Sequence, residues 1–270
     1  MLRVLFLVFL LASAQSGSLQ KEAPPAPHNI FILAGQSNMS GRGGVELNAT
    51  TGFLYWDGIL PPECQPNASI FRLDADLKWV QATEPLHDGI DTTLINGVGP
   101  GMPFAHEILH LKPDYGTIGL VPCALSGSSI KRWQRGSSLY DRLMRRVNAA
   151  VESGGKVRGM LWYQGGADSM AYENAIAYER LLTQFFRDVT EELNSPGFMI
   201  LQAAIASAKE KFTSIVRAAQ FNVKEPNLLT VDADRLPVEW DNLHLNTRGQ
   251  IQLGNLLAST YLKTSTLVVK

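Results

Sequence analysis

The sequence predicts an α/β protein in which helices cover both faces of a mainly parallel sheet. Two observations predict this class. Short apolar runs alternate along the chain with longer amphipathic segments, and most of the runs end in Gly-containing or polar turns. Such alternation is typical of strand–helix–strand units. Right-handed crossovers then place the carboxyl ends of the strands on one edge of the sheet, where open α/β sheets bind ligands.

The composition fits one large globular domain. Of the 270 residues, 45% are hydrophobic and 18% are charged, which is ordinary for a soluble protein with a single core. The formal net charge is −1 without a basic cluster, so we expect no nucleic-acid partner. We place the domain at 28–263 and a short tail at 264–270. The sequence leaves the oligomeric state open, with a monomer as the default expectation.

The N-terminal segment has the pattern of a secretory signal. Arg3 supplies the positive start, residues 4–11 are apolar, and a small-x-small site ends at Ala14. The apolar run is too short to cross a bilayer, and no later segment qualifies. We therefore expect a signal peptide over 1–14, a Pro-rich lead-in over 15–27 and a secreted protein without a membrane partner. In a plant, the destination would be the cell wall or apoplast.

The first predicted strand, Asn29–Ala34, leads directly into the sequence Gly35-Gln36-Ser37-Asn38-Met39. Its apolar run is short and is followed by a glycine, as in a buried strand. Ser37 is therefore expected at the carboxyl end of that strand. Gly35 allows a tight turn there, and Asn38 is a polar neighbour that can contact substrate.

Residues 41–96 are rich in Gly, Pro, Asn and Asp and have little periodicity. They predict long loops with short strands around 71–73 and 78–80, and loops of this length usually shape a binding site. The rest of the chain alternates regularly. The expected elements are a helix at 102–111, a strand at 118–124, a helix at 138–153, a strand at 159–163, a helix at 171–193, a strand at 198–206, a helix at 212–223, a strand at 228–231, and a helix at 247–262 with Thr247 as N-cap.

A serine hydroxyl needs a base held by a third group before it becomes a good nucleophile. The loop between the last strand and the last helix contains Asp241 and His244, three residues apart. His244 can take the proton of Ser37 while Asp241 fixes the imidazole tautomer. Alone, the pair could equally be an incidental feature of a surface loop. Its place after the last strand favours a catalytic triad.

Three sequence blocks together resemble the SGNH-hydrolase superfamily. They are Gly35-Gln36-Ser37-Asn38-Met39, Trp162-Tyr163-Gln164-Gly165, and Asp241-x-x-His244-Leu245. The resemblance extends from about His28 to Leu262 and is closest to the carbohydrate esterase branch that contains plant acetyl-xylan-esterase-like proteins and sialate O-acetylesterases. It implies a flavodoxin-like three-layer α/β/α fold and hydrolysis of acetyl esters on sugars such as acetylated xylan, without a cofactor or metal.

The same resemblance implies the roles of individual residues. Ser37 is the expected nucleophile, Asp241 and His244 complete the triad, and Gln164 stands where an amide helps to form the oxyanion hole. The backbone N–H groups of Ser37 and Gly127 are further candidate donors, because both lie at strand ends. The other interpretation of Gln164 is a polar residue that caps backbone groups.

Two blocks depart from the family pattern. Related sequences usually have Gln-Gly-Glu-Ser after the Trp-Tyr pair, whereas this chain has Gly166 and Ala167 in place of the last two. They usually have Gly-Gly in the second block, where this chain has Ser126 and Gly127. The missing Glu and Ser leave open a weakened or inactive member that binds acetylated polysaccharide.

A second motif points to different chemistry. His106-Glu107-x-x-His110 matches the helical zinc site of metalloproteases, in which both His share one face and Glu acts as base. However, Pro113 ends the helix soon afterwards and no third ligand follows at a helical position. We regard a zinc protease as a remote alternative and expect His106 and His110 to be partly exposed helix residues.

Several other residues allow two interpretations. Cys64 and Cys123 form a disulfide, or Cys123 is a small buried residue. Asn48 and Asn67 lie in glycosylation sequons within loop-like sequence, whereas a glycan on the Asn38 sequon would block the active site.

Aromatic and His residues near the predicted site are similarly ambiguous. Trp133 and Trp240 either stack on a sugar ring or pack under a loop, and Trp162 is expected in the core. His28 and His87 have no partner spacing and are expected in surface positions or loops.

Overall fold

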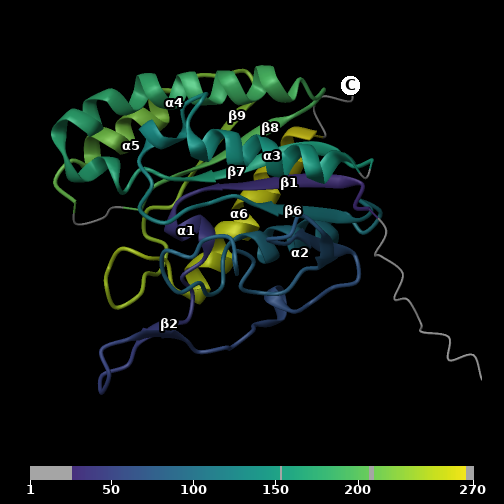
Figure 1. Ribbon diagram of the computed structural model, residues 1–270, viewed down its shortest axis with the longest axis horizontal. Coiled ribbons are helices and arrows are strands. Elements are labelled where there is room, and N and C mark those ends of the chain that lie inside the picture. The colour runs from purple at the N-terminus through teal and green to yellow at the C-terminus, as the bar shows by residue number, and fades with distance from the viewer. Residues whose placement is uncertain (1–25, 153, 207–209, 266–270) are drawn as a thin grey trace, which may run out of the picture.

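The computed structural model describes residues 26–152, 154–206 and 210–265 (Figure 1). The expected signal peptide, nearly all of the lead-in and the last five residues of the tail lie outside these ranges. A seven-stranded sheet has the order β5-β4-β6-β1-β7-β8-β9, and every neighbouring pair is parallel except β4 and β5. The strands are β1 (Asn29–Gly35), β4 (Ile70–Leu73), β5 (Trp79–Gln81), β6 (Ile118–Pro122), β7 (Lys156–Tyr163), β8 (Met199–Ala204) and β9 (Leu228–Asp232).

Helices cover both faces of this sheet, as Figure 1 shows. Helices α3, α4 and α5 lie on one face, and α2 and α6 lie on the other, where they pack against each other. This three-layer α/β/α arrangement confirms the expected fold. The helices are α2 (Gly101–Leu111), α3 (Ser138–Glu152), α4 (Tyr172–Leu193), α5 (Thr213–Asn222) and α6 (Thr247–Ser265), with the short segments α1 (Ser37–Ser40), η1 (Pro62–Cys64), η2 (Ile130–Trp133) and η3 (Asp168–Met170).

Strand β1 occupies the centre of the sheet, with β6 on one side and β7 on the other. All seven of its residues are buried, because a central parallel strand has helices on both faces and must be apolar on both. The chain therefore leaves the middle of the sheet at Gly35, and the next residues lie between the loops that follow β6 and β7.

The bounds of the elements differ from expectation by up to three residues: β7 begins at Lys156 rather than 159, and α6 ends at Ser265 rather than 262. The strand expected over 118–124 ends at Pro122, because the N–H groups of Cys123 and Ala124 both donate to the Leu33 carbonyl (2.8 and 3.0 Å). The first turn of α6 also corrects the expected N-cap. Asn246 Oδ1 accepts the Gly249 N–H (2.9 Å), so Asn246 caps the helix and Thr247 is its first residue.

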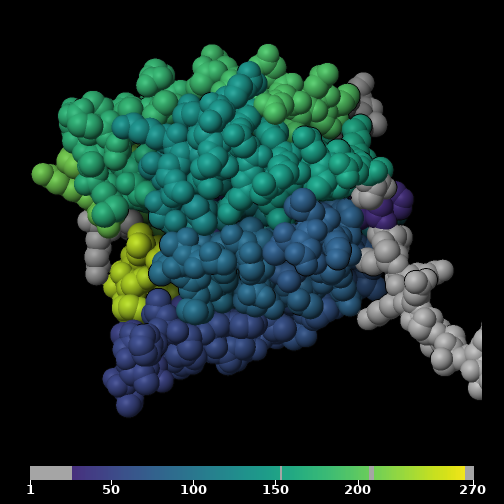
Figure 2. Space-filling model, viewed as in Figure 1, coloured from purple at the N-terminus to yellow at the C-terminus, as the bar shows by residue number. Residues whose placement is uncertain are grey.

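Sequence periodicity missed a hairpin in the region expected to be long loops. Strands β2 (Val45–Leu47) and β3 (Leu54–Trp56) pair in antiparallel fashion, and three residues each are too few for a periodic pattern. The hairpin projects from one corner of the molecule beside the segment that precedes α6 (Figure 2). The Gly44 N–H at its base donates to Glu239 Oε1 (3.1 Å), which joins the hairpin to that segment.

Both cysteines are free thiols in the structure. Cys64 and Cys123 are completely buried, and burial raises the pKa of each thiol. Of the two interpretations left open by the sequence, the disulfide is therefore not the one realised. Cys123 is a small core residue directly after β6.

His87 lies in a turn, one of the two expected positions, and the structure buries its side chain completely. Its Nε2 accepts the Ala124 N–H (3.3 Å), and its Nδ1 has no partner among the described residues. Burial, together with nearby Arg142 and Arg146, lowers the pKa of His87 to about 3, although Asp91 opposes the shift. The imidazole is thus neutral in the folded protein.

This burial predicts how stability depends on pH. Below pH 6.5 the unfolded chain binds a proton at His87 while the folded protein does not, so stability is lost as the pH falls from 6.5 towards 3. In His87→Gln, the free energy of unfolding measured with urea should decrease less than in wild type as the pH falls from 7 to 4. His28→Gln, at an exposed position, is the matched control and should keep the wild-type slope. Equal slopes in wild type and His87→Gln would contradict the assignment.

Candidate active site

The three residues proposed as a triad lie in direct contact. Ser37 Oγ is 2.9 Å from His244 Nε2, and His244 Nδ1 is 2.6 Å from Asp241 Oδ2. Because Nδ1 donates its proton to the carboxylate, Nε2 is left as the acceptor for the serine hydroxyl. A hydroxyl, an imidazole and a carboxylate are therefore arranged in the order that acyl transfer to a serine requires.

Asp241 is held as a carboxylate by its own loop. Its Oδ1 accepts the N–H groups of Leu243 (2.9 Å) and His244 (3.0 Å). Burial favours the neutral acid, but the hydrogen bonds from the His244 side chain and from both backbone groups outweigh it and lower the pKa of Asp241 to about 2. Asp241 therefore stays negative throughout the neutral range.

Asn38 fixes this loop against the helix that carries Ser37. Its Oδ1 accepts the Leu245 N–H (2.8 Å), and its Nδ2 donates to the Leu243 carbonyl (3.4 Å). The residue was expected to contact substrate, but both ends of its amide are engaged by the catalytic loop. Asn38 therefore positions His244 relative to Ser37 over a sequence separation of more than 200 residues.

The turn after β1 depends on Gly35. Its φ of +132° is rarely adopted by other residues, and a Cβ would lie 2.2 Å from the Tyr163 carbonyl oxygen. The Gln36 N–H also donates to that carbonyl (2.9 Å). The close approach of β1 to β7 at this point directs the chain into α1 and places Ser37 at its first position.

Two backbone N–H groups expected to act as oxyanion donors, those of Ser37 and Gly127, lie in the segments after β1 and β6. Ser37 is the first residue of α1, so its N–H has no acceptor within the helix. Gly127, with φ +66°, lies in the turn after β6 next to open space. Neither N–H has a hydrogen-bond partner in the part of the chain that the structure describes.

The side chain of Gln164 does not join these donors. It is completely buried, and its Nε2 donates to Asp168 Oδ2 (2.6 Å) and to the Ser128 carbonyl (2.9 Å). The same Asp168 oxygen accepts the Ile130 N–H (2.9 Å). Both amide protons are thus committed to binding the loop after β6 to the loop after β7. The expected oxyanion role is replaced by the capping role that was its alternative.

The tryptophans considered for sugar stacking differ in their exposure to solvent. Trp133 is completely buried, stacks edge-on against Trp162 and donates its indole N–H to Ser128 Oγ (3.0 Å), so it packs under a loop and has no surface for a sugar. Trp162 is in the core, as expected. Trp240 is 57% exposed beside Asp241 and has the free surface that stacking on a sugar needs.

The described residues do not supply the ligands that the zinc-protease alternative requires. His106 and His110 lie on α2, partly exposed and exposed as expected, and His106 Nε2 is hydrogen-bonded to the Gln65 carbonyl (2.8 Å). Among the described residues, no three His, Cys, Asp or Glu side chains are grouped closely enough to hold a metal ion. No helix in the described ranges is long and apolar enough to cross a membrane.

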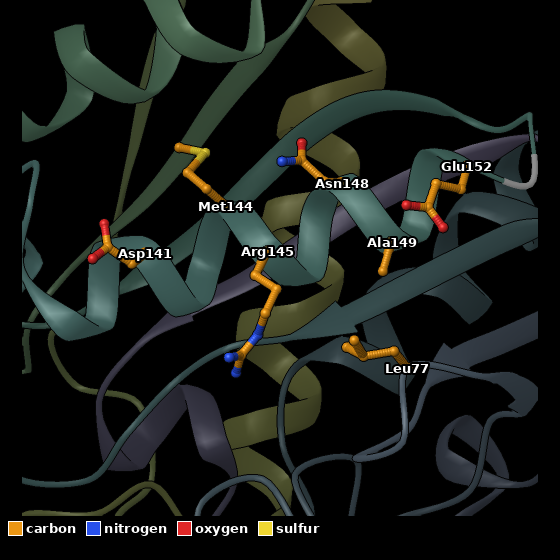
Figure 3. Close-up of a pocket in the computed structure, with 7 residues that line it drawn as sticks. All are labelled: Leu77, Asp141, Met144, Arg145, Asn148, Ala149 and Glu152. Carbon is orange, nitrogen blue, oxygen red and sulfur yellow. The ribbon is translucent and has the colours of Figure 1, made fainter.

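A hollow lies away from Ser37, Asp241 and His244, between α3 and the turn that joins β4 to β5 (Figure 3). Asp141 and Glu152 stand near the two ends of this stretch of α3, and Arg145 extends towards the side that carries Leu77. No triad residue lines it. Its acidic and basic groups are mixed on an open surface, so it lacks the features of a catalytic centre.

A buried ion pair that the sequence did not indicate supports the site. Asp91 Oδ2 accepts Ser40 Oγ (2.7 Å) and the Ser126 N–H (3.0 Å), and it lies 3.6 Å from Arg42 NH2. Asp91 thus connects α1, which begins at Ser37, with the residue before Gly127. The four residues are scattered through the sequence, so no local spacing could have predicted this network.

Removing this carboxylate should destabilise the fold. Asp91→Ala leaves the buried guanidinium of Arg42 without its counter-charge, and breaking one side of a buried pair typically costs about 3–5 kcal/mol. Urea unfolding at pH 7 measures the loss. Asp76→Ala, an exposed carboxylate in the β4–β5 turn, is the control and should stay within about 0.5 kcal/mol of wild type. A loss at Asp91 no larger than the control would show that the pair contributes nothing.

Comparisons with known proteins match this chain to carbohydrate esterases. A family model described as carbohydrate esterase, sialic acid-specific acetylesterase, matches residues 27–263. The chain is 47% identical over 242 residues to a probable carbohydrate esterase of Arabidopsis thaliana, At4g34215, covering 89% of this chain and 93% of that protein. The X-ray structure of A. thaliana AT4G34215 has a TM-score of 0.84 and covers 88% of this chain and 98% of that chain.

Two more distant crystal structures share the fold. NanS is 18% identical with a TM-score of 0.64, and the match covers 90% of this chain and 98% of that chain. XAC1771, a carbohydrate acetylesterase from Xanthomonas citri, is 17% identical with a TM-score of 0.60, and the match covers 85% of this chain and 54% of that one.

Proposed function

Because this chain belongs to the carbohydrate esterase, sialic acid-specific acetylesterase family, we propose that it removes O-acetyl groups from carbohydrates through a Ser–His–Asp triad. Membership of the family makes it a carboxylic ester hydrolase. The proposed triad mechanism is supported by the continuous hydrogen bonds from Ser37 through His244 to Asp241. Those contacts supply a nucleophile and a base without any further group.

In the proposed reaction, His244 Nε2 takes the proton of Ser37 as Oγ attacks the acetyl carbonyl carbon. The tetrahedral intermediate collapses when His244 returns that proton to the departing sugar oxygen, and Ser37 is left acetylated. His244 then removes a proton from water, whose oxygen attacks the acetyl carbon. Acetate leaves as the proton passes back to Ser37. The N–H groups of Ser37 and Gly127 are the proposed donors to the oxyanion in both steps.

The substrate we propose is an acetylated cell-wall polysaccharide such as xylan, or an acetylated sugar. The family supplies the acetyl-carbohydrate class, and the exposed face of Trp240 beside the catalytic loop gives a sugar ring a surface on which to stack. Stacking would orient the sugar while the ester lies at Ser37.

Acetate release tests the proposal directly. Wild type, Ser37→Ala and His244→Ala are assayed on 4-nitrophenyl acetate, acetylated xylan and O-acetylated sialic acid, each with and without EDTA. We expect activity that survives EDTA and is lost in both variants. A folded wild type that releases no acetate from any of the three would point to a protein that only binds acetylated carbohydrate. Activity lost with EDTA alone would point to a metal-dependent reaction.

We further propose that the protein is secreted and glycosylated. Asn48 and Asn67 both lie at turns, where each Oδ1 accepts backbone N–H groups from residues that follow it. The Nδ2 atom that would carry a glycan has no partner among the described residues at either position. When the full chain is expressed in plant or yeast cells, the protein recovered from the culture medium should begin near residue 15. Its mass should decrease after treatment with a peptide N-glycosidase. Asn48→Gln and Asn67→Gln should each remove one glycan, and an intracellular, unmodified product would contradict the proposal.

A further inference from the structure

Gln36, the residue before Ser37, has an amide whose orientation is fixed by its neighbours. Its Oε1 accepts the N–H groups of Gly165 (3.2 Å) and Ala167 (3.3 Å) in the loop after β7. Gln164 Nε2 lies 3.5 Å from the same oxygen. A backbone N–H can only donate, so these contacts identify which end of the amide is oxygen and which is nitrogen.

This orientation leaves the Nε2 end of Gln36 free. It has no hydrogen-bond partner among the residues described, and it is not among the buried polar atoms that lack one, so it reaches solvent. A pocket beside the nucleophile is lined by Gln36, Ser37, Asn38, Tyr163, Gly166, Ile205, Ala206 and Leu243. Gln36, whose Nε2 has no partner among the described residues, therefore lines the same pocket as the proposed nucleophile.

Gly166 leaves this donor uncovered. A Cβ at position 166 would lie 3.1 Å from Gln36 Nε2, so a side chain there would crowd or cover the amide. The φ of Gly166 lies outside the left-handed region, so the backbone itself would accept another residue. The absence of a side chain at position 166 thus affects access to Gln36 Nε2 rather than the backbone conformation. This gives a physical meaning to a position where related sequences usually carry Glu.

We infer that Gln36 Nε2 donates a hydrogen bond to an oxygen of the ester bound beside Ser37, and that Gly166 keeps this donor accessible. The inference rests on the proposed esterase function. The oxygens of an acetyl ester are acceptors only, so the substrate offers the partner that the amide lacks. The donor costs no reorganisation when substrate binds, because Gly165 and Ala167 already hold the amide in place.

Two substitutions at Gln36 separate a substrate contact from a purely structural one. Gln36→Glu keeps an oxygen for the N–H groups of Gly165 and Ala167 but has no proton to donate at neutral pH. Gln36→Met is neutral and of similar length, and it removes both functions. We expect both variants to lower kcat/KM for 4-nitrophenyl acetate and acetylated xylan by roughly ten- to a hundredfold, with Gln36→Glu keeping a melting temperature close to that of wild type.

The outcomes of this comparison are distinct. Activity retained in Gln36→Glu but lost in Gln36→Met would mean that Gln36 only anchors the loop after β7, which would overturn the inference. Activity retained in both would overturn it as well. Gln65→Glu adds the same charge at an exposed position outside the pocket and should behave as wild type.

Gly166→Val supplies an independent, uncharged test. Its side chain should cover Gln36 Nε2 and lower kcat/KM to a similar extent, and the Gln36→Met change should then add little to the effect. Full activity in Gly166→Val would contradict the role given to Gly166.

A binding measurement separates this inference from the proposed function. In a Ser37→Ala background, which cannot turn over, calorimetry with acetylated xylo-oligosaccharides should show weaker binding when Gln36→Glu is added. Weaker binding with no turnover in wild type would sustain the Gln36 contact and reject the esterase proposal. Equal binding together with unchanged turnover would reject the contact alone.

Discussion

Ser37→Ala is expected to lower kcat for acetyl-ester hydrolysis by at least about ten-thousandfold, because no acyl-enzyme can form without the hydroxyl. His244 has no other hydroxyl to activate at this position, since the next serine of α1, Ser40, donates its hydroxyl to Asp91 (2.7 Å). The variant should fold normally, because among the described residues Ser37 Oγ makes a hydrogen bond to His244 Nε2 alone. Steady-state acetate release measures kcat, and thermal unfolding checks the fold.

The control is a half-buried serine at the other end of the sheet. Ser195 donates its hydroxyl to the Val157 carbonyl (2.9 Å) near the start of β7, so Ser195→Ala should keep full activity. Mass spectrometry of wild type mixed with a fluorophosphonate should show one added group, and the Ser37→Ala protein should show none. A Ser37→Ala protein that retains a tenth or more of the wild-type kcat would place the nucleophile elsewhere.

The order of elements was predictable because strands in the middle of a parallel sheet must be apolar on both faces. The run of seven buried residues in β1 and the shorter runs of β6 and β8 give that signal without any tertiary information. The β2–β3 hairpin gives no such signal, because its three-residue strands pair only with each other and stand partly exposed.

The contact among Ser37, His244 and Asp241 was also predictable, because each residue follows the end of a strand. Ser37 follows the first strand, and Asp241 and His244 share one loop after the last strand, so a common sheet edge brings them together. The two hydrogen bonds of Asn38 to the backbone of Leu243 and Leu245 hold the loop so that these contacts measure 2.6 and 2.9 Å. The sequence identified Asn38 only as a polar neighbour of Ser37.

The residues around the triad were less predictable, because their roles depend on partners remote in sequence. Gln164 is the clearest case: its Nε2 donates to Asp168 and to the Ser128 carbonyl, whereas the Nε2 of Gln36 has no partner among the described residues and only its Oε1 is engaged. Both residues are glutamines beside glycine at the end of a strand. Only the packing of the loop after β6 against the loop after β7 decides which amide faces the pocket. The burial of His87 and Trp133 likewise depends on partners remote in sequence, Ala124 and Trp162.

Asp241→Asn is expected to lower kcat by about ten-thousandfold while leaving the fold intact, by analogy with the same change in serine proteases. The carboxylate accepts the Nδ1 proton of His244 at 2.6 Å. If the amide oxygen keeps the backbone hydrogen bonds of Leu243 and His244, the amide nitrogen faces Nδ1 as a donor. His244 then carries its proton on Nε2 and cannot accept the proton of Ser37.

The pH dependence adds a second test of this assignment. Hydrogen bonds lower the pKa of Asp241 to about 2 even though burial opposes ionisation, so the carboxylate is ionised at every pH at which the enzyme is assayed. Any loss of wild-type activity between pH 7 and 4 should therefore come from protonation of groups other than Asp241. A carboxyl carbon-13 resonance of Asp241 that titrates between pH 7 and 4 would contradict this.

Kinetics and structure together distinguish a tautomer effect from a folding defect. Asp241→Asn should retain the melting temperature of wild type to within a few degrees and still bind acetylated xylan, because Ser37, Trp240 and the pocket are unchanged. Asp114→Asn, an exposed carboxylate in the turn after α2, is the matched control and should keep full kcat. If Asp241→Asn loses less than tenfold in kcat, the 2.6 Å contact is structural and the base is oriented by another group. If it loses ten-thousandfold with normal binding, Asp241 acts on the chemical step through the tautomer of His244.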